Sequence, residues 1–158
     1  MKKKILFVCL GNICRSPAAE AIFLKLIKSK GLKEDFFVDS AGTGNWHAGK
    51  KADLRMRNIA KKRGIIIESL ARQVCLDDLQ KFDLILTMDN DNYQAMQLMN
   101  EQIRSKVNAV IKPILSYSDK DDLNVPDPYY GGDLGFENVL DLLEEACEAL
   151  LENIIYSS

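Results

Sequence analysis

The chain has 158 residues, of which 47% are hydrophobic and 28% are charged, and its formal net charge is −2 at neutral pH. This length and composition are typical of one globular domain that folds without disulfides or metal, and the near-neutral charge argues against binding to nucleic acid or to anionic membranes. Four scattered cysteines without a Cys-x2-Cys pair, together with a single histidine, exclude the usual zinc-binding patterns.

Short apolar runs alternate with segments of helical periodicity along the chain. The run at residues 5–8 (Ile-Leu-Phe-Val) is continuous and partly β-branched, which is typical of a buried strand. Residues 138–155 repeat apolar side chains at helical spacing, which indicates a long amphipathic helix. In chain order, strands are expected at residues 5–9, 36–41, 82–87 and 107–111, and helices at residues 17–29, 53–63, 91–99 and 138–155.

This alternation predicts an α/β fold, with a parallel sheet, helices on both faces and right-handed crossovers. In such folds ligands bind beyond the carboxyl ends of the strands. Polar segments follow the first three predicted strands, at residues 9–16, 39–42 and 88–92. We expect these segments to converge on one rim of the sheet, and the functional site to lie there.

The loop at residues 9–16 (Cys-Leu-Gly-Asn-Ile-Cys-Arg-Ser) joins the first strand to the first helix. Unpaired backbone N–H groups and the helix dipole favour an anion at a helix N-terminus, where a thiol such as Cys9 ionises readily. Gly11 and Asn12 tolerate positive φ, which would turn successive N–H groups inward as an anion-binding nest. The loop therefore predicts a site that holds a phosphoryl group.

Arg15 and Ser16 add two further groups to this loop. The guanidinium of Arg15 offers a planar fork for two phosphoryl oxygens, a geometry that lysine lacks. Ser16 could cap the helix or donate a hydrogen bond to the thiolate. A cysteine at a strand end can also be a small packed hydrophobe, but the flanking strand and helix favour Cys9 as a nucleophile.

Asp127 is the candidate general acid, because a phosphate ester needs its leaving oxygen protonated. Pro126 and Pro128 fix the backbone on either side of its carboxylate. The alternative is a proline-rich turn with a solvated aspartate. Nearby aspartates at residues 119–122 lack this rigid frame and are expected in a solvated loop. A reaction that needs Cys9 ionised and Asp127 protonated predicts a mildly acidic pH optimum.

Residues 9–17, 39–43 (Asp-Ser-Ala-Gly-Thr) and 127–130 (Asp-Pro-Tyr-Tyr) together resemble the low-molecular-weight protein tyrosine phosphatases. The resemblance spans nearly the full chain, with the motifs in the expected order. It implies a single domain at residues 1–158, whose four-stranded parallel sheet has the order 2-1-3-4 and whose phosphate loop lies between the first strand and the first helix.

The resemblance implies a two-step reaction without metal or cofactor. Cys9 would attack phosphotyrosine while Arg15 and the loop amides hold the phosphoryl oxygens. Asp127 would protonate the departing phenolate and then activate water to hydrolyse the phosphocysteine. Ser16 would stabilise the thiolate that leaves in the second step.

The resemblance also implies which residues surround the reacting groups. Asn12, held by Ser40, would keep the loop in its left-handed kink. Trp46 would wall the cleft beside an aromatic substrate, although in isolation it could equally be a packing anchor. The implied substrate-binding residues are Leu10, Gly11, Asn12, Ile13, Cys14, Ser16, Trp46, Tyr129 and Tyr130, with Ser40, Asp89 and Asn92 in supporting positions.

The remaining cysteines and the histidine carry weaker expectations. The resemblance implies that Cys14 can form a reversible disulfide with Cys9 under peroxide, although a small residue that fills the loop is the alternative. Cys75 and Cys147 are expected in the core or partly buried. His47 lies in a polar loop and is expected to be exposed to solvent.

One residue departs from the family pattern. Many members carry a histidine two residues before the alanine of Ala-Arg-Gln at residues 71–73, where it supports the phosphate loop, and this chain has Ser69. The departure concerns how strongly the thiol is activated, rather than which reaction occurs.

The expected partners are phosphotyrosine-containing proteins, with neither nucleic acid nor membrane involved, and the protein is expected to act as a monomer. The basic start and the apolar run at residues 5–10 are too short for a secretory signal, which favours a cytoplasmic location. Reduced cysteines are then expected.

Two other functions fit parts of the sequence. Arsenate reductases of the same fold also use a loop cysteine, but they need further redox cysteines, and after Cys75 no partner follows before Cys147. Such enzymes also lack the Asp-Pro-Tyr-Tyr segment. A non-catalytic phosphate-binding module would make Asp127 irrelevant, and replacing Cys9 with serine would then leave ligand affinity intact.

Overall fold

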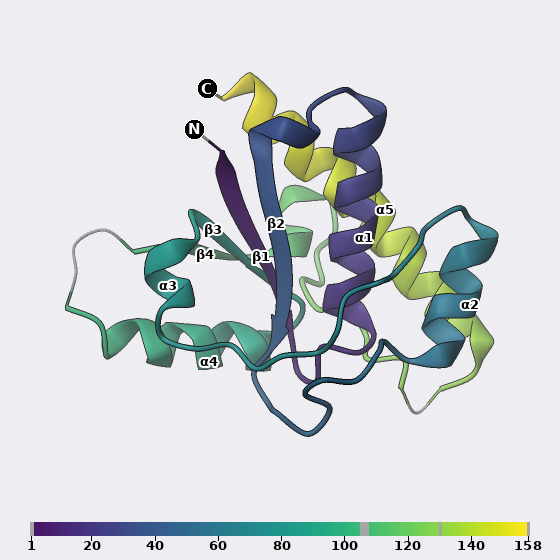
Figure 1. The fold of residues 1–158 in the computed structure, drawn as a ribbon, viewed down its shortest axis with the longest axis horizontal. Coiled ribbons are helices and arrows are strands. Elements are labelled where there is room, and N and C mark those ends of the chain that lie inside the picture. The colour runs from purple at the N-terminus through teal and green to yellow at the C-terminus, as the bar shows by residue number, and fades with distance from the viewer. Residues whose placement is uncertain (1, 105–107, 130, 158) are drawn as a thin grey trace.

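The computed structural model describes residues 2–104, 108–129 and 131–157. Its centre is a parallel sheet of four strands in the order β2-β1-β3-β4 (Figure 1). This confirms the predicted architecture and strand order. The strands are β1 (Lys3–Cys9), β2 (Phe36–Gly42), β3 (Leu84–Thr87) and β4 (Val110–Pro113).

Helices cover both faces of the sheet, as predicted. Figure 1 shows α1, α2 and α5 on one side and α3 and α4 on the other. The helices are α1 (Arg15–Ser29), α2 (Leu54–Lys62), α3 (Asp78–Lys81), α4 (Asn90–Glu101) and α5 (Asp133–Tyr156), with short 3-10 turns η1 (Lys33–Asp35) and η2 (Ile114–Tyr117). Within the described residues, no helix is both long and apolar enough to cross a membrane.

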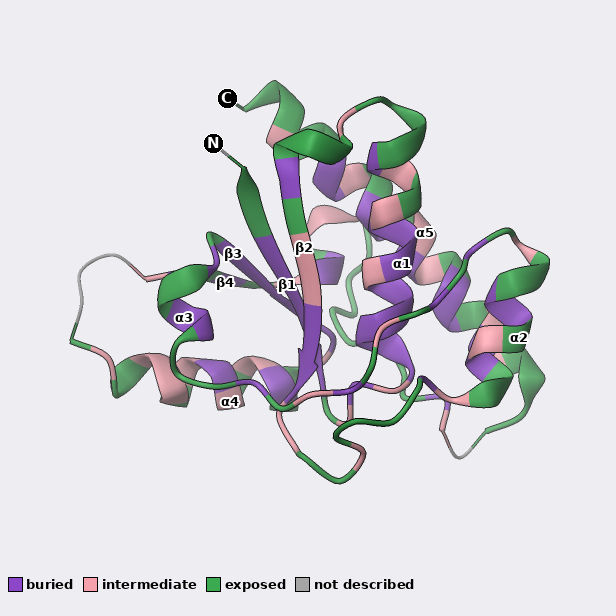
Figure 2. Cartoon of the chain, in the orientation of Figure 1, coloured by how far each residue is buried: buried purple, intermediate pink, exposed green. Residues whose placement is uncertain are grey.

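The apolar run of β1 contributes to a core on each side of the sheet, because successive side chains of a strand point to opposite faces. Ile5 and Phe7 pack into the core beneath α1 and α5, whereas Leu6 and Val8 pack into the smaller core on the α4 side. Figure 2 shows β1 buried along most of its length. The central strand is therefore held firmly, and Cys9 lies at its carboxyl end.

Several element boundaries differ from the predicted ones. β3 begins at Leu84, and β4 spans Val110–Pro113 instead of residues 107–111, of which residue 107 lies outside the described part of the chain. α5 begins at Asp133 instead of 138, because its first turn includes the buried Phe136 beside the exposed Leu134, a pair that obscures the apolar periodicity. The four-residue helix α3 is too short to produce a periodic signal.

The start of α1 also differs from the expectation. The helix begins at Arg15 with Cys14 at the N-cap position, and no side chain caps it. Ser16 lies inside the first turn, so of its two predicted roles the capping role is wrong. Its hydroxyl is directed to the phosphate loop instead.

Candidate active site

The three polar segments predicted to converge do meet at the carboxyl edge of the sheet. Cys9 ends β1, and its Sγ accepts a hydrogen bond from the Asn12 backbone N–H at 3.3 Å. The same sulfur lies 3.0 Å from Ser16 Oγ. The Asn12 N–H donates to the sulfur and the Ser16 hydroxyl lies where it can do the same, and such donors stabilise a thiolate.

Asn12 holds the loop in its kink through both its backbone and its side chain. Its φ is 58°, in the left-handed region that non-glycine residues rarely adopt. Its side-chain nitrogen donates to Ser16 Oγ at 2.8 Å and to Ser40 Oγ at 3.0 Å, and its side-chain oxygen accepts from the Arg72 backbone N–H at 3.0 Å. The side chains of Asn12 and Ser16 thus lie behind the loop instead of on the cavity wall.

Gly11 was predicted to share the positive φ, and this is wrong, because within the loop at residues 9–16 only Asn12 adopts it. Gly11 leaves room for a neighbouring side chain instead. A Cβ at this position would lie 3.0 Å from Cδ2 of His47. The absence of a side chain therefore lets the loop at 46–47 pack against the phosphate loop.

Arg15 is buried at the base of the site, and acceptors from two other segments orient its guanidinium. Nη1 donates to Asp89 Oδ2 at 2.6 Å and to the Val125 carbonyl at 3.1 Å. Burial opposes the charge of Arg15, but the neighbouring Cys9 and Asp89 raise its pKa above the ordinary value. The guanidinium therefore stays charged.

Asp89 is itself held by the helix that it caps. Its side chain accepts from the Asn92 backbone N–H at 2.9 Å, and the Asp89 backbone N–H donates to Asn92 Oδ1 at 3.1 Å, which forms a capping box at α4. Both residues were predicted in supporting positions. The structure places Asp89 against Arg15, and Asn92 against Asp89.

Asp127 lies at the mouth of the site in the loop that precedes α5. Its Oδ2 is 3.5 Å from Arg15 Nη2, and its side chain is 37% exposed. The loop is anchored on one side by the Val125 N–H, which donates to the Met88 carbonyl at 2.6 Å. On the other side the Arg55 guanidinium donates to the Tyr129 carbonyl at 2.8 Å.

A cavity of about 390 Å³ opens above the loop and brings most of the predicted residues together. Its base carries Cys9 and Arg15, and Asp127 lies on its rim. Trp46, which is 65% exposed, and Tyr129 form aromatic walls. The other predicted residues on its wall are Leu10, Gly11, Ile13 and Cys14. Tyr130 lies outside the described residues.

The remaining expectations for cysteine and histidine meet with mixed outcomes. Cys147 is fully buried, as predicted, but Cys75 is exposed, because it lies in the turn before α3. His47 was expected in solvent, but it is half-buried and lines the cavity. Burial, together with Asp53 and Cys9, raises the pKa of Cys14, so this thiol is protonated.

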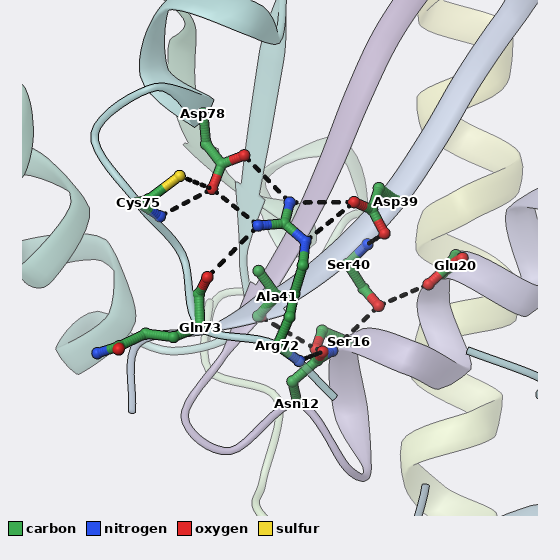
Figure 3. A network of polar contacts seen from close by, with 10 residues as sticks. All are labelled: Asn12, Ser16, Glu20, Asp39, Ser40, Ala41, Arg72, Gln73, Cys75 and Asp78. Atoms are coloured by element: carbon green, nitrogen blue, oxygen red, sulfur yellow. Dashed lines mark hydrogen bonds and ion pairs between the residues drawn. The ribbon is translucent and has the colours of Figure 1, made fainter. Parts of the chain in front are cut away.

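Three charged residues near the site were missed by sequence reasoning. Arg72 joins Asp39 and Asp78 through its guanidinium (Figure 3), Arg55 contacts the loop of Asp127, and Glu20 contacts Ser40 at 2.5 Å. Their partners lie far away in the sequence, so residue spacing gives no signal for them. The only local signal for any of the three was that Arg72 lies close in sequence to Ser69, where the chain departs from the family pattern.

The described residues contain no group of three or more His, Cys, Asp or Glu side chains that could hold a metal ion. The chemistry that the site offers is instead that of a buried sulfur and a guanidinium at a helix N-terminus, with a carboxyl group nearby. Such a site can bind an oxyanion and attack it.

Comparisons with known proteins agree with this geometry. A family model described as low molecular weight phosphotyrosine protein phosphatase matches residues 4–157. A putative low molecular weight protein-tyrosine-phosphatase of Synechocystis is 48% identical over 152 residues, which cover 96% of each chain.

Solved structures give the same result. A protein tyrosine phosphatase from Entamoeba histolytica, crystallised with Hepes in its active site, matches with a TM-score of 0.90 at 45% identity and covers 99% of both chains. A Drosophila arginine phosphatase matches with a TM-score of 0.93 at 34% identity over all of both chains. With a family model that spans residues 4–157 and relatives of this identity, the chain belongs to the low molecular weight phosphotyrosine protein phosphatases and is a hydrolase of that type.

Proposed function

We propose that the protein hydrolyses phosphotyrosine in phosphoproteins through a phosphocysteine intermediate on Cys9. In the first step Sγ attacks the phosphorus, so that an S–P bond forms while the bond to the phenolic oxygen breaks. Arg15 and the loop N–H groups hold the phosphoryl oxygens. The observation that carries this proposal is the sulfur of Cys9 at the cavity base, with Ser16 Oγ at 3.0 Å and the Asn12 N–H at 3.3 Å.

Asp127 supplies the proton that the leaving phenolate needs, and then removes a proton from the attacking water. Water attack breaks the S–P bond and releases phosphate, and the thiolate returns to the donors from Ser16 and Asn12. The position of the carboxyl at the rim, 3.5 Å from Arg15 Nη2, supports this role. A carboxyl within reach of the bound phosphoryl group is what general acid catalysis requires.

The walls of the cavity favour an aryl substrate. Ile13 and the rings of Trp46 and Tyr129 can pack against a phenyl group. Because one neighbouring structure is named for arginine dephosphorylation, phosphoarginine is the informative comparison. The ring of phosphotyrosine is neutral, whereas phosphoarginine would bring a second guanidinium beside Arg15. We therefore expect phosphotyrosine to have the higher kcat/KM.

The two other candidate functions have less support. An arsenate reductase would pass a disulfide from Cys9 to further cysteines, but Cys147 is fully buried and its Sγ contacts the Ala19 carbonyl at 3.8 Å. A binding module would have no use for the carboxyl of Asp127 at the cavity rim. The free cysteines accord with the reducing cytoplasm that we propose as the location.

Hydrolysis of aryl phosphates tests the proposal. We expect the wild-type protein to turn over p-nitrophenyl phosphate without added metal, and Cys9→Ser to abolish turnover while phosphate still binds. Asp127→Ala should depress kcat about 10²–10⁴-fold for phenyl phosphate and less for p-nitrophenyl phosphate, whose leaving group needs no proton. Equal losses for both esters would remove Asp127 from the acid role, and an inactive wild-type protein would contradict the whole proposal.

A further inference from the structure

A continuous line of hydrogen bonds runs from Glu20 in α1 to the sulfur of Cys9. Ser40 Oγ donates to Glu20 Oε1 at 2.5 Å. The Asn12 amide connects Ser40 to Ser16 (Figure 3), and Ser16 Oγ lies 3.0 Å from Cys9 Sγ. The site as described so far uses the Cys9 end of this line and gives Glu20 no role.

The orientation of the Asn12 amide is fixed by a donor that cannot accept. The Arg72 backbone N–H faces one atom of the Asn12 amide at 3.0 Å, so that atom is the oxygen. The amide nitrogen must then face the two serines and donate to both of them.

Each serine therefore accepts from Asn12 and has to place its own proton elsewhere. Ser40 gives its proton to Glu20. Ser16 can give its proton to Cys9 Sγ at 3.0 Å or to the Ala41 carbonyl at 3.4 Å, and the shorter contact is the one to sulfur. The acceptor at the Glu20 end thus keeps Ser40 as an acceptor for Asn12, and Asn12 in turn holds Ser16 with its own proton free for the sulfur.

Glu20 lies in a separate hollow of about 300 Å³ between α1 and the segment 66–69. Burial raises the pKa of its carboxyl, and Asp39 acts in the same direction, whereas hydrogen bonds from Ser40 and Ser69 and the charge of Arg72 act against both. The exposed carboxylate of Glu68 lines the same hollow. A half-buried carboxyl with a raised pKa, at the end of a line to the nucleophile, calls for a functional explanation.

We propose that Glu20 is a positioning residue for Cys9: by accepting the Ser40 proton it keeps Ser40 Oγ as an acceptor for Asn12, which in turn donates to Ser16 Oγ and leaves the Ser16 proton to the sulfur. The proposal rests on Cys9 being the nucleophile and names the residue that holds its donor in place. Ser69, the residue that departs from the family pattern, donates a hydrogen bond to the same carboxyl and so belongs to this network.

The pH dependence of Cys9 alkylation by iodoacetate tests the proposal, with the modified residue identified by fragmentation mass spectrometry so that Cys75 does not contribute. If Glu20 were only a nearby negative charge, its removal would favour the thiolate and move the alkylation midpoint to lower pH. If it orients the donor, Glu20→Ala moves the midpoint to higher pH, by about 0.5–1 unit for one hydrogen bond. The sign of the shift therefore decides between the two roles.

Three further variants sharpen the result. Glu20→Gln keeps a neutral acceptor and should shift the midpoint less than Glu20→Ala does. Ser40→Ala breaks the same line at its next link, so the double variant with Glu20→Ala should shift it no further than the larger single change. Glu68→Gln removes a charge from the same hollow without touching the line, and should not move the midpoint upward.

A midpoint that is unchanged or lower in Glu20→Ala, or additive shifts in the double variant, would overturn the proposal. Thermal melting of each variant shows whether it folds. Should Glu20→Ala fail to fold, Glu20→Gln and Ser40→Ala still test the proposal through the same upward shift. Alkylation needs no turnover, so the result stays distinct from the proposed function, which fails only if the wild-type protein hydrolyses no aryl phosphate.

Discussion

The guanidinium of Arg15 is oriented before any substrate arrives. Asp89, the Val125 carbonyl and Asp127 contact it within 2.6–3.5 Å, and its side chain is only 3% exposed. A guanidinium fixed in this way loses little side-chain entropy when it binds two phosphoryl oxygens. At the scale of single residues, we therefore expect binding of the phosphoryl group to depend on the acceptors behind Arg15 as well as on Arg15.

Asp89→Asn isolates the contribution of the charged contact to Arg15. Asparagine can still accept from the Asn92 N–H and cap α4, so the helix should remain. Because a hydrogen bond between charged groups contributes about 1.5–3 kcal/mol, we expect the inhibition constant for phosphate to rise at least tenfold. Asp91→Asn in the same helical turn is the matched control, and an unchanged inhibition constant in Asp89→Asn would contradict the account.

The first turn of α2 connects the phosphate loop to the loop of Asp127. Asp53 caps this helix, and its backbone N–H donates to the Ile13 carbonyl at 2.8 Å. Two residues later, Arg55 donates to the Tyr129 carbonyl at 2.8 Å, and its guanidinium lies 4.8 Å from the ring centre of Phe136 in α5. At the scale of elements, α2 therefore fixes Asp127, the proposed general acid, relative to Cys9.

Arg55→Met tests this connection, because methionine keeps an apolar stem over Phe136 but cannot donate to Tyr129. We expect kcat for phenyl phosphate to fall about tenfold, as one hydrogen bond to a charged group would allow. The loss should be smaller for p-nitrophenyl phosphate, whose departure depends less on Asp127. Arg57→Met, in the same helix, should leave both rates unchanged, and an equal loss for both esters in Arg55→Met would place the effect elsewhere.

The sequence predicted those features whose evidence lies within one short segment of the chain. The run at residues 5–8 is short, apolar and partly β-branched, as in a buried strand, and the loop 9–16 carries its chemistry within eight residues, so both were found. The bonds from Arg72 to Asp39 and Asp78 could not be found in this way, since they depend on how β2 and α3 pack. Gly11 and Ser16 were misassigned for the same reason, because the contacts that determine their roles come from His47 and Cys9.

At the scale of the whole molecule, Arg72 ties the carboxyl end of β2 to the start of α3. Burial acts to raise the pKa of the Asp78 carboxyl, but Arg72 and the Cys75 N–H outweigh it and hold this pKa below its usual range. A carboxyl whose pKa is lower in the folded state contributes stability above its unfolded pKa of about 3.9, and loses that contribution as pH falls.

Urea unfolding at several pH values checks this contribution. We expect the free energy of unfolding of the wild-type protein to fall more steeply below about pH 5 than that of Asp78→Asn, by about 1 kcal/mol over the range. Asp77→Asn, at the neighbouring exposed position, serves as the control. Parallel curves for the wild-type protein and Asp78→Asn would show that Asp78 carries no such linkage.

The most direct test of the central claim is mass spectrometry of the protein quenched in acid during turnover of an aryl phosphate. The account predicts that the peptide containing Cys9 gains the mass of one phosphoryl group on sulfur, and that Cys9→Ser never shows this gain. Rapid hydrolysis by the wild-type protein, without any detectable phosphorylated Cys9, would contradict it.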